Sequence, residues 1–151
     1  MSAMLISFYQ NIFVEFATTG GRAHHTFRTN ANEPKKEALQ FILKQRQNGE
    51  TIHILAQQWW LHWPLKYLSY KEPGVLISFH LSEALEGLKQ HPGVMWVVEF
   101  TNHNENIRGK DALPQMGMPY FDENFILDAK GEPVVSLLRG FSDENKKREK
   151  L

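Results

Sequence analysis

Residues 94–100, with the sequence VMWVVEF, form an almost continuous apolar run. A strand with one face in water alternates apolar and polar residues, whereas a strand covered on both faces is apolar throughout. We therefore expect residues 94–100 to form a strand that is covered on both faces. The chain has 151 residues, which favours one domain with its own core. We expect residues 1–141 to form a single globular domain and the charged residues 142–151 to form a frayed tail.

Two hairpins are predicted from alternating apolar residues next to turn residues. We interpret residues 4–29 as a hairpin that turns at Gly20 and Gly21, because glycine reaches positive φ at little cost. Residues 124–128 and 133–138 are expected to pair in the same way across a short turn that contains glycine. Both hairpins favour antiparallel strand pairing.

Two helices are predicted from an apolar stripe or from residues typical of helix ends. The first lies between Asn32, a candidate N-cap residue, and Gly49, and Pro34 suits its first turn. The second covers residues 83–90 and can be capped by Ser82. We expect both helices to pack on the sheet.

The run WWLHWPLKYL at residues 59–68 can be interpreted in two ways. If the run is a strand, Trp59 and Trp63 lie on its apolar side and Trp60 lies on the other side. Pro64 within this run argues for an edge strand or a break. The alternative is a short helix that ends before Pro64.

Strands are also predicted at residues 52–56 and 75–81, and residues 102–120 are predicted to be a long irregular segment. Hairpins combined with two helices indicate an α+β fold. The expected architecture is a mainly antiparallel sheet of about six to eight strands with two helices packed on it.

The charge and the cysteine content exclude some functional classes. Lys plus Arg and Asp plus Glu number 17 each, so no overall field attracts nucleic acid or an anionic membrane, and nucleic-acid binding is disfavoured. The chain has no cysteine, which excludes disulfides and thiolate zinc sites and fits a reducing compartment. No apolar stretch approaches the length of about 20 residues that spans a bilayer. We expect a cytoplasmic protein without a membrane partner and without a cofactor.

A basic row is the first candidate site. On the predicted strand at residues 22–29, Arg22, His24, Thr26 and Arg28 share one face. Two guanidinium groups beside a histidine can bind a phosphate, a nucleic-acid backbone or the carboxylates of a partner. The alternative is the solvated side of an edge strand, where charge prevents aggregation.

The clustered tryptophans are the second candidate. Trp59, Trp60 and Trp63 lie within five residues, and tryptophan is enriched in both protein cores and protein interfaces. They are expected either to form a binding patch or to pack in the core under a helix. Pro64 favours an edge position and therefore a partner.

The polar loop that follows residues 94–100 is the third candidate. It contains His103, Glu105 and Arg108, and long loops on a rigid scaffold often carry function. His103 and Glu105 lack a third ligand at a diagnostic spacing, so no metal site is predicted. Asn-rich loops also occur simply because Asn suits turns.

These features lead to two functional hypotheses. The leading one is a non-enzymatic protein-binding domain, such as an inhibitor, an immunity-type protein or an accessory factor, which uses an aromatic and basic sheet edge. The alternative is a metal-independent phosphoesterase or ribonuclease-like enzyme. In that mechanism His24 and His103 exchange protons while Arg22 and Arg28 stabilise charge in the transition state.

Overall fold

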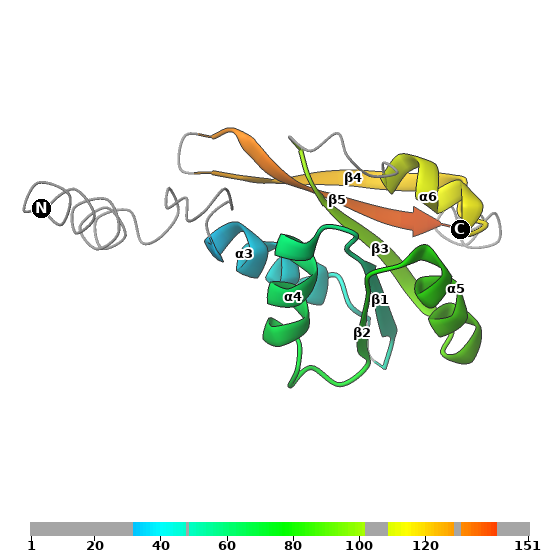
Figure 1. Ribbon diagram of the computed structural model, residues 1–151. Coiled ribbons are helices and arrows are strands. Elements are labelled where there is room, and N and C mark those ends of the chain that lie inside the picture. Colours follow the sequence, from blue (N-terminus) through cyan, green and yellow to red (C-terminus); the bar gives the residue numbers. More distant parts are fainter. Residues whose placement is uncertain (1–31, 48, 102–108, 129–130, 142–151) are drawn as a thin grey trace, which may run out of the picture.

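The computed structural model describes residues 32–47, 49–101, 109–128 and 131–141 (Figure 1). The elements of this part of the chain, in order, are α3 Asn32–Lys44, β1 Thr51–Leu55, α4 Trp59–Leu68, β2 Val75–Ser78, α5 Leu81–Gln90, β3 Gly93–Phe100, α6 Gly109–Gln115, β4 Tyr120–Leu127 and β5 Pro133–Phe141.

The five strands form one mixed sheet in the order β2-β1-β3-β5-β4. β1 pairs in parallel with both β2 and β3, whereas β5 pairs antiparallel with β3 and β4. The prediction of a mainly antiparallel sheet with six to eight strands and two helices is therefore wrong. The described residues contain five strands and four helices.

The parallel half of the sheet follows from the helical connections. A parallel pair needs a crossover, usually a helix, because the chain must return to the same end of the sheet. α4 connects β1 to β2, and α5 connects β2 to β3 across β1. The antiparallel half is a direct hairpin of β4 and β5, with Gly131 at a φ of 83° in its turn.

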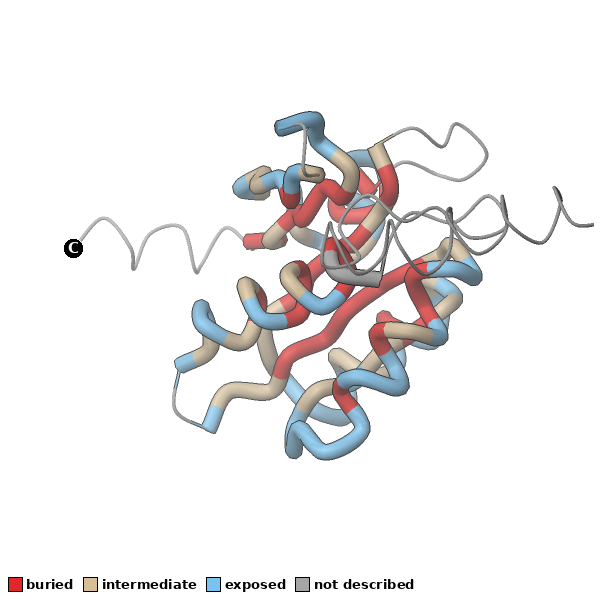
Figure 2. Tube along the Cα trace, turned by 90° about the vertical axis from the view of Figure 1, so that its left-hand side faces the viewer, coloured by how far each residue is buried: buried red, intermediate tan, exposed pale blue. Residues whose placement is uncertain are grey.

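Helices cover both faces of the sheet, so the described fold has three layers (Figure 1). α3 and α4 pack on one face of the sheet. The strand side chains on this face, which come from every second residue, include Ile52, Ile54, Trp96, Val98 and Leu137. α5 and α6 pack on the other face against Leu55, Met95, Val97 and Leu138. Figure 2 shows buried segments running through the middle of the molecule between helices whose outer sides are exposed.

Several sequence predictions are confirmed. α3 begins at Asn32, and residues 94–100 lie in β3 with apolar side chains buried on both faces. The C-terminal hairpin is present, with strands longer than predicted. The hairpin predicted at residues 4–29 lies outside the described residues.

Other boundaries are corrected. Residues 59–68 form α4 instead of a strand, and α4 continues past Pro64. β2 ends at Ser78, and α5 already begins at Leu81, with His80 rather than Ser82 as its N-cap residue. Part of the segment predicted to be irregular forms α6.

Candidate binding surface

The first residues of α4 lie at the carboxyl end of β1, next to the end of β3. The Gln58 side-chain oxygen accepts a hydrogen bond from the Phe100 backbone N–H at 2.8 Å, which joins the two strand ends. β1 leads to α4 on one face of the sheet, whereas the next helix after β3, α6, lies on the other face. In open α/β sheets, ligands bind beside such a switch point at the carboxyl ends of the strands.

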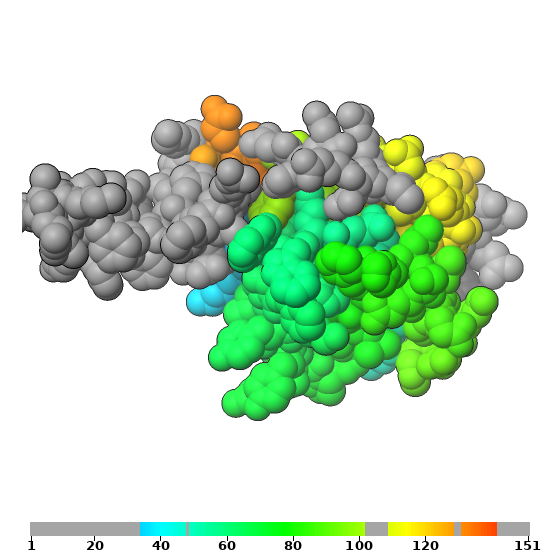
Figure 3. Space-filling view, viewed as in Figure 1, coloured from blue at the N-terminus to red at the C-terminus, as the bar shows by residue number. Residues whose placement is uncertain are grey.

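The helical period brings the tryptophans to one side of α4. At about 100° per residue, the positions of Trp59, Trp60, Trp63 and Tyr67 fall within an arc of about 100°. We call these four residues the aromatic face. Their exposed fractions are 58%, 48%, 47% and 79%, so the rings meet solvent. In Figure 3 the segment that contains α4 lies on the surface towards the viewer, with side chains that protrude.

The opposite side of α4 faces the core. Leu61 and Leu65 are fully buried against the sheet, and their burial fixes the rotation of the helix. The same rotation directs the aromatic face outwards. The aromatic face is therefore a consequence of helix packing.

Contacts between side chains orient the aromatic rings. The rings of Trp59 and Trp63 meet edge to face, with centroids 5.3 Å apart. The Lys66 ammonium lies 5.5 Å from the Trp63 ring centroid, which is within cation–π range. His62 contacts Trp63 and Phe79 edge to face, with centroids 5.1 and 5.2 Å away. These contacts restrict the rings before any partner binds.

The segment that carries the aromatic face has positive but no negative side chains. No Asp or Glu occurs between Glu50 and Glu72, whereas Lys66 and Lys71 lie in that interval. Both lysine side chains are exposed, and each ammonium lies over an aromatic ring. The face therefore combines aromatic surface with positive charge.

His62 is buried directly beside this face. Burial lowers its pKa, the positive charge of Lys66 lowers it further, and Glu83 opposes the shift. Its Nδ1 is buried and has no hydrogen-bond partner among the described residues. A neutral imidazole therefore fits this position better than a charged one.

Pro64 lies inside α4 and cannot donate to the Trp60 carbonyl, because proline has no N–H. The first turn is held by the Gln58 carbonyl, which accepts hydrogen bonds from the N–H groups of Leu61 and His62 at 2.9 Å each. The burial of Leu61 and Leu65 offsets the missing bond. Tertiary packing explains why the helix continues past Pro64.

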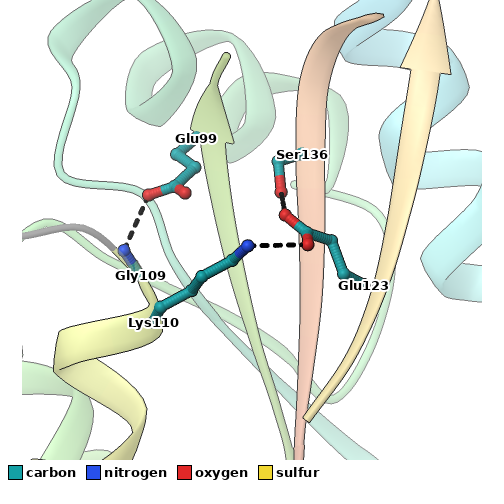
Figure 4. A network of polar contacts seen from close by, with 5 residues as sticks. All are labelled: Glu99, Gly109, Lys110, Glu123 and Ser136. Carbon is teal, nitrogen blue, oxygen red and sulfur yellow. Dashed lines mark hydrogen bonds and ion pairs between the residues drawn. The ribbon is translucent and has the colours of Figure 1, made fainter. Parts of the chain in front are cut away.

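A polar network lies on the other face of the sheet, around α6 (Figure 4). Glu99 accepts a hydrogen bond from the Gly109 N–H at 2.7 Å. Glu123 pairs with Lys110 at 2.8 Å and accepts a hydrogen bond from the Ser136 hydroxyl at 3.1 Å. Both carboxylates are thus engaged, and the network attaches α6 to three strands.

The predicted site residues divide into two groups. Trp59, Trp60 and Trp63 are described, and the helix brings them together instead of placing Trp60 on the opposite side. The other predicted binding and catalytic residues lie outside the described part of the chain: Arg22, His24, Arg28, His103 and Arg108. That these residues contribute to one binding surface with the tryptophans stays a prediction.

The sequence interpretation missed Gln58, Lys66 and Tyr67 as parts of this surface. The spacing of four residues between Trp59, Trp63 and Tyr67 is the signal that identifies a helical aromatic stripe. The strand interpretation of the same run concealed this spacing.

Comparison with known proteins found no matching family model, no matching curated protein and no matching solved structure. Among the described residues, no helix is long and apolar enough to cross a membrane. The described residues also contain no group of three His, Cys, Asp or Glu side chains that could hold a metal ion.

Proposed function

We propose that this protein is a protein-binding domain whose interface is the aromatic face of α4. The observation that carries the proposal is the exposure of Trp59, Trp60 and Trp63 together on one side of a helix. Tryptophan and tyrosine are enriched among the residues that dominate binding energy at interfaces. Half-exposed rings that a partner can cover are the anchors that such an interface needs.

The restricted rings support this function. Ordering a mobile side chain at an interface costs about 0.5–1.5 kcal/mol. The edge-to-face contact of Trp59 with Trp63 and the stacking of Lys66 on Trp63 reduce that cost before binding. The aromatic face is therefore partly preorganised.

The charge defines the partner more closely. Lys66 lies over the Trp63 ring, Lys71 lies over the Tyr70 ring just after α4, and residues 51–71 contain no acidic residue. A partner surface with apolar side chains surrounded by Asp and Glu complements it. We therefore expect salt to slow association with this partner.

Affinity capture from the source cells tests the proposal. The full chain, a Trp60→Ser/Trp63→Ser double variant and a Lys89→Ser control are immobilised, and the bound proteins are compared by quantitative mass spectrometry. Trp60, Trp63 and Lys89 are all exposed, so both variants are expected to fold. We expect the chain and the control to retain one partner that the double variant loses. Equal capture by all three proteins contradicts the proposal.

A lipid surface is the competing occupant for tryptophan, tyrosine and lysine side chains. Sedimentation with vesicles that contain anionic lipid separates the two possibilities. Binding to vesicles that the Trp60→Ser/Trp63→Ser change abolishes, together with no captured partner, overturns the protein-binding proposal.

The enzymatic hypothesis depends on His24, His103, Arg22 and Arg28, which lie outside the described residues. It stays a prediction of the sequence.

A further inference from the structure

β2 forms an edge of the described sheet, with β1 as its one neighbouring strand among the described residues. The carbonyls of Gly74 and Ser78 accept hydrogen bonds from the N–H groups of Ile52 and Ala56 at 2.8 and 3.0 Å. Backbone groups alternate in direction along a strand. The N–H and C=O of Ile77 and the C=O of Val75 therefore point away from β1.

A groove with a volume of about 660 Å³ runs along this edge. Lys66 at the end of α4, with Ser69 and Tyr70 just after it, lies on one side, and α5 contributes Glu83, Glu86 and Gln90 to the other. All four residues of β2 line the groove. The outward backbone groups of β2 are thus at the base of a slot between two helices. An added strand needs both of these features.

The charge of the groove is negative. Its lining contains the carboxylates of Glu72, Glu83 and Glu86 against the one ammonium of Lys66. Glu83 accepts a hydrogen bond from the Phe79 N–H, and Glu86 accepts one from Gln90, so both carboxylates are held in place. The occupant that complements this charge is basic.

The two sides of the groove differ in chemistry. Val75 and Ile77 pack towards the α3 and α4 face, beside Tyr70. Leu76 has the opposite parity, is 37% exposed and lies on the side of α5 with its glutamates. Lysine or arginine can lay its aliphatic stem on Leu76 and direct its charge to the glutamates.

We propose that the β2 edge binds an extended basic peptide segment of a partner as an additional strand. Every second side chain of the segment is Lys or Arg and faces Glu83 and Glu86. The alternate side chains are apolar and face Tyr70, Val75 and Ile77. This surface is distinct from the aromatic face, although Lys66 contacts both the Trp63 ring and the groove.

The probe is a fluorescein-labelled peptide of alternating lysine and valine, titrated with the full chain in fluorescence anisotropy. A Glu83→Gln/Glu86→Gln variant keeps the acceptor oxygens but loses the charge. We expect it to bind about fivefold more weakly, the scale of two partly exposed ion pairs. The control is an Asp111→Asn/Glu132→Gln variant, which makes the same charge change at exposed positions outside the groove lining. We expect the control to bind as the wild type does.

Backbone pairing is tested separately. An Ile77→Pro variant removes an outward N–H and leaves the bonds from β1 to Gly74 and Ser78 in place, because proline is tolerated on sheet edges. We expect this variant to bind the peptide about tenfold more weakly than the wild type does. N-methylation of every second peptide residue removes the N–H groups along one edge of the peptide, and we expect the wild type to lose the same affinity for the peptide methylated on the edge that pairs with β2. The peptide N-methylated on its other edge keeps its affinity.

Three results overturn the proposal. The first is no binding of the peptide at millimolar concentration. The second is equal binding of both N-methylated peptides, which indicates attraction by charge alone. The third is a dimer in sedimentation that Ile77→Pro converts to a monomer, because the edge then pairs with a second copy of the chain.

Discussion

The Gln58 side chain accepts a hydrogen bond from the Phe100 N–H at 2.8 Å, so the residue before α4 is attached to the last residue of β3. β1 ends at Leu55, which pairs with Val97, and β3 extends beyond that point. The Gln58 side chain therefore continues the pairing where β1 has already ended. The same contact fixes the start of the helix that carries the aromatic face.

Replacing Gln58 with leucine is expected to destabilise the fold. The Phe100 N–H loses this acceptor, which costs about 1–3 kcal/mol of the free energy of unfolding in a partly buried site. Urea denaturation at pH 7.5 measures the change. A Gln58→Glu variant retains an acceptor oxygen and is expected to stay within about 1 kcal/mol of the wild type. Equal stability of the leucine variant and the wild type shows that this contact is not stabilising.

Acid is expected to weaken the fold through two buried histidines. Burial lowers the pKa of His53 and of His62 below the usual value of 6.5. In the pH range below 6.5 and above the lowered values, the unfolded chain binds more protons than the native chain. The free energy of unfolding therefore falls as pH falls through this range, by at most about 1.4 kcal/mol per pH unit for each histidine.

Urea denaturation at several pH values from 7.5 to 5 measures this dependence. His53 Nε2 lies 2.6 Å from the His91 carbonyl oxygen. A neutral His53 ring with its proton on Nε2 donates a hydrogen bond to that oxygen. Its Nδ1 is buried and has no hydrogen-bond partner among the described residues. A His53→Gln variant keeps a donor for that carbonyl and is expected to lose about half of the pH dependence. A wild-type stability that does not change between pH 7 and 5 contradicts this account.

Gly109 is expected to tolerate no side chain. A Cβ there would lie 2.6 Å from Leu138 Cδ1 and 2.7 Å from Val97 Cγ1. Alanine is better than glycine by about 1 kcal/mol in a helix interior, but Gly109 is the first residue of α6, and overpacking of this kind costs about 1–3 kcal/mol. We therefore expect Gly109→Ala to lower the melting temperature.

A Gln115→Ala variant in the same helix is the control. Gln115 is exposed, so this change is expected to alter the free energy of unfolding by no more than about 0.5 kcal/mol. If Gly109→Ala raises the melting temperature, helix propensity outweighs the close approach of α6 to the sheet.

Several individual elements could be predicted from local signals, although the architecture could not. The residues at the start of α3, the apolar run of β3 and the glycine turn before β5 each indicate the element that the structure contains. In these segments the local preference and the tertiary environment agree.

The topology could not be predicted because residues 59–68 fit two periods. Leu61 and Leu65 share strand parity with Trp59 and Trp63, and they are also spaced as one buried side of a helix. With this segment interpreted as a strand, the first β-α-β unit, β1-α4-β2, is not predicted, although the strand, helix and strand predicted at residues 75–81, 83–90 and 94–100 correspond to the second. The order of the mixed sheet depends on both helical crossovers, α4 and α5, and on the pairing of β5 with β3.

The candidate surfaces were only partly predictable for the same reason. The sequence predicts that the tryptophans form a cluster, either at a surface or in the core. Their arrangement on one side of a helix depends on the helical period of α4. The groove at β2 depends on sheet order, which is set by contacts between distant residues. α6 is short and contains Pro114, and its position depends on contacts such as Glu99 with Gly109 that no local pattern reveals.

Site-specific photo-crosslinking tests most directly whether the aromatic face binds a protein partner. A benzoylphenylalanine residue replaces Trp60 on the aromatic face in one protein and exposed Gln115 on α6 in another, and both are irradiated in the source cells. We expect one discrete cross-linked protein from position 60 and none from position 115. The same pattern of products from both positions, or no product from position 60, contradicts this expectation.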